Sequence, residues 1–240
     1  MSIHIGTSGW HYRHWAERFY PGGLNSAAWL GYYAREFGCV EINNSFYRLP
    51  SPEKLAQWRA QTPDGFLFAL KASRYITHMK KLRDCAQPLA ALLGVARCLG
   101  DRLAAVLFQL PPRWRVNVER LAGFLDLLPD DLQCAFEFRD PSWHVEGVYA
   151  LLREHAVGLC QFDLAGLQSP SVVTAGLVYV RLHGPREAYS GRYTDTALKT
   201  WAERLRGWDA QGHDVLVFFD NDQDACAVHD ARRLQHWVDA

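Results

Sequence analysis

Short apolar runs recur along the chain, each too brief for a helix and each followed by turn residues and a segment with helical periodicity. Eight of these runs predict β-strands: Ile3 to Gly6, Cys39 to Asn43, Phe66 to Lys71, Ala104 to Leu110, Cys134 to Arg139, Gly158 to Asp163, Leu177 to His183 and Val215 to Asp220. Seven segments predict helices: Ser26 to Phe37, Pro52 to Ala60, Cys85 to Leu99, Val118 to Leu128, Glu146 to His155, Thr196 to Asp209 and Asp224 to Val238. The connection from Leu164 to Ala175 contains Ser, Pro and Gly and is at most weakly helical.

Strands that alternate with helices require a parallel sheet with right-handed crossovers. Eight such units in 240 residues predict a (β/α)₈ barrel of the TIM type, with residues 1–240 as a single domain. A doubly wound open sheet is the alternative. It is disfavoured because Gly6-Thr7-Ser8-Gly9, after the first strand, is shorter than the GxGxxG motif of dinucleotide-binding folds.

Polar side chains stand at the end of every predicted strand, at the face where TIM barrels carry their chemistry. These residues are Ser8, Glu41, Asn43, Lys71, Gln109, Glu137, Arg139, Gln161, Asp163, Arg181, His183, Asp220 and Asn221. Side chains alternate along a strand, so residues two apart project to one side. Three pairs have this spacing: Glu41 with Asn43, Glu137 with Arg139, and Arg181 with His183.

Both faces of a parallel barrel strand are covered, so ionisable groups there need partners or a ligand. We therefore interpret the polar strand ends as one shared site. The alternative is an interior lattice of salt bridges that pairs Glu41 and Glu137 with Lys71, Arg139 and Arg181, because structural ion networks also concentrate charge.

Aromatic residues are frequent in the loops that follow these strands. Trp10 and Tyr12 follow the first strand, Trp143 follows the fifth, and Tyr189 follows the seventh. Aromatic rings at the mouth of a pocket offer flat apolar walls to a sugar or a base. The seventh loop also places Arg192 beside Gly191, a pattern suited to an anion clamp.

The charge balance and the lack of long apolar stretches limit the kinds of partner we expect. Lys plus Arg and Asp plus Glu both total 26, so a net charge of zero creates no global field for nucleic acid or an anionic membrane. No stretch reaches the roughly 20 apolar residues of a membrane helix, and MSIHIGTSGW lacks the pattern of a signal peptide. We expect a soluble cytoplasmic protein.

A divalent metal is a second option for the strand ends. Glu41, Glu137, Asp163, His183 and Asp220 are hard ligands that suit Mg²⁺, Mn²⁺ or Zn²⁺. However, the chain has no HExxH motif, and Arg139 and Arg181 compete for the same carboxylates. We therefore predict a site without a cofactor, with a metal as the alternative.

Several segments taken together resemble the YecE-like family, a domain of unknown function. The segments are IGTSGWHYRHW, FYP, VEINNSFYRLP, FALKASRYITH, FQLPP, EFRDPSW, YVRLHG and FFDND, and they cover nearly the whole chain in order. The resemblance implies a TIM-type barrel and no established activity. The family's motif positions, which include Tyr47, Thr77 and His78, coincide with the ring of strand-end residues that alternation selects, and this agreement supports a common site. Asp140 departs from the family pattern, where we expect histidine in many members.

We predict an enzyme of acid/base type that acts on a small anionic substrate with a sugar-like or nucleotide-like part. Glu137 or Glu41 is the predicted general base, His183 the acid or proton shuttle, and Lys71, Arg139 and Arg181 hold developing negative charge. The residues predicted to bind substrate are Ser8, Trp10, Tyr12, Asn43, Tyr47, Gln109, Arg139, Trp143, Asp163, Arg181, Tyr189, Arg192 and Asn221.

Two other functions remain open. One is metal-dependent hydrolysis of a phosphoester, including nucleic acid, by analogy with other barrel enzymes; the zero net charge counts against a long polyanion. The other is a binding protein that holds a metabolite without turnover.

Overall fold

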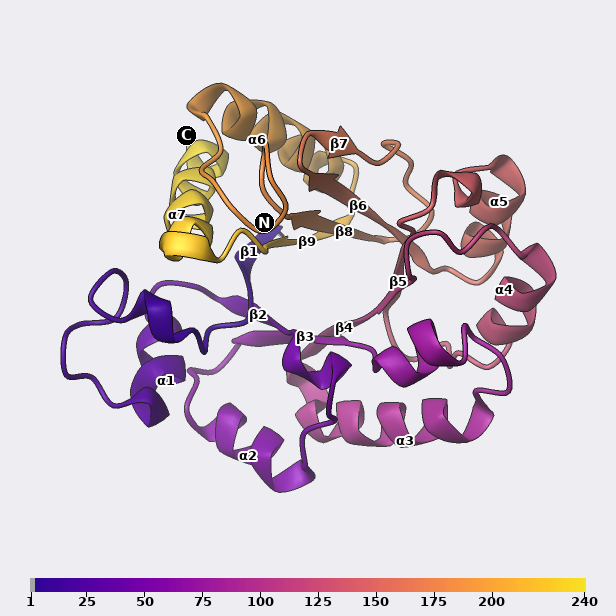
Figure 1. Ribbon diagram of the computed structural model, residues 1–240, viewed down its shortest axis with the longest axis horizontal. Coiled ribbons are helices and arrows are strands. Elements are labelled where there is room, and N and C mark those ends of the chain that lie inside the picture. Colours follow the sequence, from indigo (N-terminus) through magenta and orange to yellow (C-terminus); the bar gives the residue numbers. More distant parts are fainter. Residues whose placement is uncertain (1–2) are drawn as a thin grey trace.

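The computed structural model describes residues 3–240 and shows a closed barrel of eight parallel strands surrounded by helices (Figure 1). The barrel strands are β1 (Ile3–Ser8), β2 (Cys39–Ile42), β3 (Leu67–Lys71), β4 (Leu103–Gln109), β5 (Cys134–Glu137), β6 (Gly158–Leu164), β8 (Leu177–Leu182) and β9 (Asp214–Phe219). Their order in the sheet is β5-β4-β3-β2-β1-β9-β8-β6, and pairing between β5 and β6 closes the ring. The prediction of a TIM-type barrel is confirmed. Met1 and Ser2, which belong to the predicted single domain, lie outside the described residues.

Helices follow the strands and cover the outside of the barrel (Figure 1). They are α1 (Trp29–Tyr33), α2 (Pro52–Ala60), α3 (Ala86–Ala96), α4 (Val118–Leu125), α5 (Glu146–Glu154), α6 (Asp195–Ala210) and α7 (Cys226–Asp239). Ser51, Asn117 and Thr194 cap the starts of α2, α4 and α6, each by accepting a hydrogen bond from a backbone N–H of the first turn. None of the described helices is long and apolar enough to cross a bilayer.

Two connections differ from the predicted helices, and a third contains a short strand that was not predicted. The segment predicted as a helix from Ser26 to Phe37 is a short 3₁₀ helix, Ser26–Ala28, followed by the single turn and a half of α1. The segment predicted to run from Cys85 to Leu99 ends as an α-helix at Ala96 and continues as 3₁₀ turns to Arg102, where Gly100 takes a φ of 58°. After β6 the chain forms no helix but turns back as β7 (Leu167–Gln168), antiparallel to β6.

The inside of the barrel is filled in two layers. Deep in the barrel lies an apolar layer that mixes small and large side chains: Cys39, Ala69, Ala105, Leu107, Ala135, Cys160, Leu177, Tyr179, Leu216 and Phe218. The outward faces of the same strands carry larger residues such as Phe68, Phe108 and Phe136, which pack against the helices. One step further along the strands, toward their carboxyl ends, the inward positions become polar, except on β6, where Phe162 follows Cys160. We call that end the mouth of the barrel.

Candidate functional site

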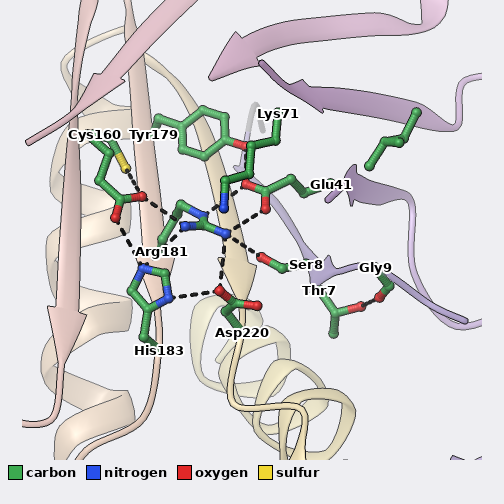
Figure 2. Close-up of polar contacts among 12 residues, drawn as sticks. Thr7, Ser8, Gly9, Glu41, Lys71, Cys160, Tyr179, Arg181, His183 and Asp220 are labelled. Carbon is green, nitrogen blue, oxygen red and sulfur yellow. Dashed lines mark hydrogen bonds and ion pairs between the residues drawn. The ribbon is translucent and has the colours of Figure 1, made fainter. Parts of the chain in front are cut away.

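Arg181 lies at the centre of the mouth and is fully buried (Figure 2). Its guanidinium binds the Glu41 carboxylate with two hydrogen bonds, from Nε at 3.0 Å and from Nη2 at 2.7 Å. Nη1 donates to Glu137 Oε2 at 2.9 Å, and Nη2 also reaches Asp220 Oδ2 at 3.1 Å. One cation thus joins carboxylates from β2, β5 and the end of β9. These ion pairs offset the free-energy cost of burying the charges.

His183 stands beside Arg181 with both ring nitrogens engaged. Nδ1 lies 2.9 Å from Asp220 Oδ2 and donates to it, while Nε2 lies 2.9 Å from Nη2 of Arg139. Because a guanidinium only donates, Nε2 is the acceptor in the contact with Arg139, and the proton on Nδ1 points to Asp220. Arg139 also donates from Nε to Glu137. We call these six residues the ionic cluster: Glu41, Glu137, Arg139, Arg181, His183 and Asp220.

The surroundings of the carboxylates determine whether they are protonated or ionised. Burial alone would raise the pKa of Glu137, but the guanidiniums of Arg139 and Arg181 hold it well below the usual range. Burial acts in the same way on Asp220, where Arg181 and the hydrogen bond from His183 lower the pKa. Both groups are therefore ionised at neutral pH and engaged by cations, which makes them weak proton acceptors in this arrangement.

Lys71 lies at the edge of the ionic cluster, at the end of β3, and its side chain reaches toward Arg181 and Glu41 (Figure 2). It is 7% exposed and has its ammonium nitrogen 4.6 Å from the centre of the Phe46 ring. Within residues 3–240 the nitrogen makes no hydrogen bond or ion pair. Burial and the nearby charge of Arg181 lower the pKa of Lys71 to about 8, so the neutral amine is accessible near neutral pH.

Most residues predicted at the strand ends reach the mouth. Ser8 accepts a hydrogen bond from Arg181 at 3.3 Å. Tyr189, 48% exposed, sets its ring against His183 with ring centres 5.7 Å apart. Gln109 follows the inward-facing Leu107 by two residues on β4, but its amide contacts only the carbonyl oxygen of Leu110, at 3.5 Å.

A second group of predicted residues lines a cavity of about 720 Å³ beside the mouth, next to β1 and β2. Among the predicted residues, this cavity is lined by Trp10, Tyr12, Asn43 and Tyr47. No residue of the ionic cluster lines this cavity, but Tyr12 links the two, because its hydroxyl donates to the carbonyl oxygen of Ser8 at 2.5 Å and the Ser8 hydroxyl accepts from Arg181. Burial, together with the negative charge of Asp220, raises the pKa of Tyr12 well above its usual value, so this phenol stays protonated.

Four predicted substrate-binding residues lie elsewhere. Trp143 is fully buried, stacks on the outward-facing Phe138 and donates its indole N–H to the carbonyl oxygen of Trp114. Asn221 points the other way from Asp220 and binds Asp230 of α7 at 2.9 Å. Both side chains hold helices and loops to the outside of the barrel and do not reach the mouth.

Asp163 and Arg192 also lie outside the mouth. On β6 the inward positions are taken by Cys160, whose thiol lies 3.9 Å from Glu137 Oε2, and Phe162, which lies under the Arg139 guanidinium. Asp163 therefore projects outward, where it accepts a hydrogen bond from Gln168 of β7 and burial raises its pKa. Arg192 is exposed and its side chain contacts Cys226 at the start of α7.

Two members of the site were not among the predicted catalytic or binding residues. Asp220, noted only as a strand end and a candidate metal ligand, holds both His183 and Arg181. Tyr179 donates its hydroxyl to Glu41 Oε2 at 2.7 Å from within the barrel. The period of two along β8, continued back by one step from Arg181, would have found Tyr179.

Within residues 3–240, no three His, Cys, Asp or Glu side chains are arranged to share a metal ion. The physical reason lies in the ionic cluster: Glu41 and Glu137 turn their oxygens toward guanidiniums, and Asp163 lies on the opposite face of its strand. Of the five suggested metal ligands, Glu41, Glu137, His183 and Asp220 therefore meet in the ionic cluster but are engaged by guanidiniums and by one another, and Asp163 lies apart from them.

These features define a class of protein: a TIM barrel with a buried ionic cluster at the carboxyl ends of its strands. The chain belongs to the family described as Protein of unknown function DUF72, whose sequence model matches residues 4–240. This confirms the resemblance to the YecE-like family.

Two curated relatives carry this family's other designation. The chain is 34% identical over 146 residues to UPF0759 protein YecE of Escherichia coli strain K12, a match covering 60% of this chain and 51% of that protein. The match thus spans about half of the length of that relative. The chain is 27% identical to UPF0759 protein YunF of Bacillus subtilis strain 168, across 99% of this chain and 95% of that protein.

Solved structures show the same fold. A DUF72 family protein from Thermotoga maritima aligns with a TM-score of 0.89 and 27% identity, covering 99% of both chains. A DUF72 family protein from Enterococcus faecalis aligns with a TM-score of 0.83 and 20% identity, covering 99% of this chain and 96% of that one. The barrel is therefore the fold of the family.

Proposed function

We propose that this protein is an enzyme of acid/base type that acts on a small anionic substrate at the barrel mouth. The observation that carries the proposal is a pair of cationic groups with unused donors at the edge of a saturated ionic cluster. Lys71 makes no hydrogen bond, and Nη1 of Arg139 is likewise without a partner within residues 3–240. Two unused donors at the open end of a barrel suit a carboxylate or phosphate of a substrate.

The burial of so many charges favours a functional site over the alternative of an interior lattice of salt bridges that only stabilises the fold. Removing an ion from water costs several kcal/mol even after relaxation, and replacing buried ion pairs by apolar residues is often neutral or stabilising. A lattice built for stability alone would have no reason to leave Lys71 without a polar partner beside three carboxylates. A lysine with a pKa of about 8 can instead exchange a proton near neutral pH.

The roles follow from the contacts. Lys71 is the group that gives or takes the proton, and Arg139 holds the anionic group. Arg181 and the pair of His183 with Asp220 keep Glu137 and Arg139 in place. Glu41 and Glu137, which the sequence suggested as general bases, act here by holding the cations, because their oxygens are occupied by guanidinium and phenol donors.

The neighbouring cavity supports a substrate with a neutral, hydroxyl-rich or heterocyclic part. Its walls combine the rings of Trp10, Tyr12 and Trp58 with carboxamides, and its described lining residues include no carboxylate. The carboxamides of Asn43, Asn44 and Gln61 make no hydrogen bond within residues 3–240. Aromatic faces together with free amides suit a sugar ring or a nucleobase.

A thermal-shift screen of sugar phosphates, nucleotides and small carboxylic acids, followed by turnover assays of the compounds that bind, tests the proposal. We expect anionic compounds to raise the melting temperature of the wild type and Lys71→Met to lower kcat at least about 100-fold, the usual contribution of general acid/base catalysis. Lys199→Met, on the exposed side of α6, is the matched control and should retain full turnover. Unchanged turnover in Lys71→Met would remove Lys71 from the mechanism.

A further inference from the structure

The amine of Lys71 has the setting of a nucleophile. Charged and titratable groups face it from several elements: Glu41 of β2, Glu137 of β5, Arg181 of β8 and Asp220 after β9, with Arg181 and Glu41 the strongest influences. The Phe46 ring lies against it from the loop after β2. None of these groups bonds to the nitrogen, so its lone pair, once deprotonated, is directed to no protein atom within residues 3–240.

His78 adds a second neutral base at the same place. Burial and the positive charges of Lys71, Arg74 and Arg139 lower its pKa to about 4, so its ring is uncharged at neutral pH. Nδ1 pairs with the Thr77 hydroxyl at 2.9 Å, and the ring lies edge-on to Phe46 with centres 4.9 Å apart. The neutral imidazole therefore adds no positive charge to that of Arg181, which already lies beside the Lys71 amine.

We infer that Lys71 forms a covalent imine with the carbonyl group of a small anionic aldehyde or ketone bound at the barrel mouth. This inference rests on the proposed function, because it names the substrate class and the chemical step at the same site. The neutral amine is the form that attacks carbonyl groups, and burial together with a nearby cation makes that form more abundant at Lys71 than at an ordinary lysine. The free donor of Arg139, two strands away, would hold the anionic group of the same molecule.

The step balances without a cofactor. The lone pair of Nζ attacks the carbonyl carbon while the π bond of the carbonyl breaks, and a proton passes from nitrogen to oxygen to give a carbinolamine. A second proton, supplied by solvent, converts the hydroxyl into water, and loss of that water leaves the protonated C=N bond. Neither an oxidant nor a reductant is consumed.

Reductive trapping tests the inference without any known substrate. The full chain is treated at pH 7.5 with glyoxylate and cyanoborohydride, which reduces an imine to a stable carboxymethyl amine, and each lysine is mapped by peptide mass spectrometry. Lys54, Lys81 and Lys199 are exposed and serve as internal controls. At this pH a group with a pKa of about 8 is roughly a quarter neutral, against about 0.1% for an ordinary lysine.

We expect Lys71 to be labelled at least tenfold faster than the three exposed lysines, and this advantage to fall at pH 10, where all of them lose their protons. Propanal, a neutral aldehyde, should show a smaller preference for Lys71, because it lacks the group that Arg139 binds. Lys71→Arg should remove the fast labelling and leave the exposed lysines unchanged.

Labelling of Lys71 at or below the rate of the exposed lysines would overturn the inference. If Lys71→Met still abolished turnover of a substrate found in the screen, the acid/base function would stand and only the imine would fail. If Lys71 were labelled rapidly but Lys71→Met turned over every substrate normally, the imine chemistry would be real and the proposed catalytic role would fail.

Discussion

Arg181 shows how a single side chain organises the mouth of this barrel. It is fully buried, and burial alone would lower its pKa, but Glu41, Glu137 and Asp220 raise it well above the usual value. Three carboxylates face three cations at the mouth, Lys71, Arg139 and Arg181, so the group is close to neutral as a whole. A change at one member therefore leaves another buried charge without its partner.

Tyr179→Phe removes one hydrogen bond to Glu41 while keeping the ring. The hydroxyl is buried and donates at 2.7 Å to a carboxylate, and hydrogen bonds to charged groups contribute about 2 kcal/mol. We expect the free energy of unfolding to fall by about 2 kcal/mol with the fold unchanged, measured by urea denaturation.

Tyr47→Phe is the matched control for that measurement. The Tyr47 side chain is 74% exposed, and its hydroxyl makes no hydrogen bond within residues 3–240, so its loss should leave stability within about 0.5 kcal/mol of the wild type. Equal effects of the two substitutions would show that the Tyr179 hydroxyl does not stabilise Glu41.

Glu137→Gln should make stability less sensitive to acid. The folded pKa of Glu137 lies below its unfolded value, so the carboxylate stabilises the fold fully above about pH 4.3 and loses this contribution as the pH falls through the folded pKa. At pH 7 we expect the variant to be less stable by about 3 kcal/mol, because Arg139 and Arg181 lose their charged partner.

Urea denaturation of both proteins between pH 7 and pH 3.5 measures this effect. The difference between wild type and Glu137→Gln should be constant from pH 7 to about pH 5 and then shrink, because the unfolded wild-type chain takes up a proton at Glu137 while the folded carboxylate is still ionised. A difference that grows toward acid would show that the folded pKa of Glu137 is raised and not lowered.

At the scale of elements, Gly6 allows β1 to approach β2. A Cβ atom on Gly6 would lie 2.2 Å from the carbonyl oxygen of Cys39, which is backbone and cannot move aside alone. Tyr33 of α1 reinforces this contact, because its hydroxyl donates to the same oxygen and accepts from the backbone N–H of Thr7. This close approach explains why β1 has glycine at an inward position.

Gly6→Ala should therefore destabilise the barrel by about 3 kcal/mol or more, since overpacking against backbone forces the strands apart. Gly207→Ala is the control: Gly207 lies within α6 with nothing within 4 Å of an added Cβ, and alanine there should stabilise by about 1 kcal/mol. Thermal denaturation followed by circular dichroism compares both with the wild type. A tolerated Gly6→Ala would mean that β1 and β2 can separate without cost.

The elements were predictable where the pattern was strong. All eight barrel strands lie where the short apolar runs predicted them, because strands buried on both faces must be apolar. The prediction of one long helix around α1 was wrong, because Gly31 and three aromatic residues have low helix propensity. The aromatic rings are held instead by contacts with other parts of the chain. The hairpin of β7 was missed because two residues carry no periodic signal.

For the whole molecule, the site could be predicted only where side chains alternate between the two faces of a strand. Glu41, Glu137, Arg181 and His183 meet as the spacing of two indicated. Asp163 was misplaced because the apolar Cys160 and Phe162 take the inward face of β6, and sequence alone does not show which face is inward when both are buried. Trp143 was misplaced because a loop aromatic can fold back onto the outside of its own strand.

The barrel should unfold as one unit. Arg181 joins strands from both halves of the sheet, so opening any part exposes unpaired charges elsewhere. We expect circular dichroism and tryptophan fluorescence to report one coincident urea transition. Two separated transitions would show that the halves of the barrel are independent.

The position of Arg181 late in the chain has a consequence for synthesis. Its partners Glu41 and Glu137 precede it by 140 and 44 residues, so a nascent polypeptide displays both acids long before the arginine leaves the ribosome. Arg139 can already pair with Glu137, but until Arg181 emerges, closing the early strands would bury the Glu41 carboxylate without its ion pair. We expect truncated chains that end before residue 181 to remain open and to attract chaperones.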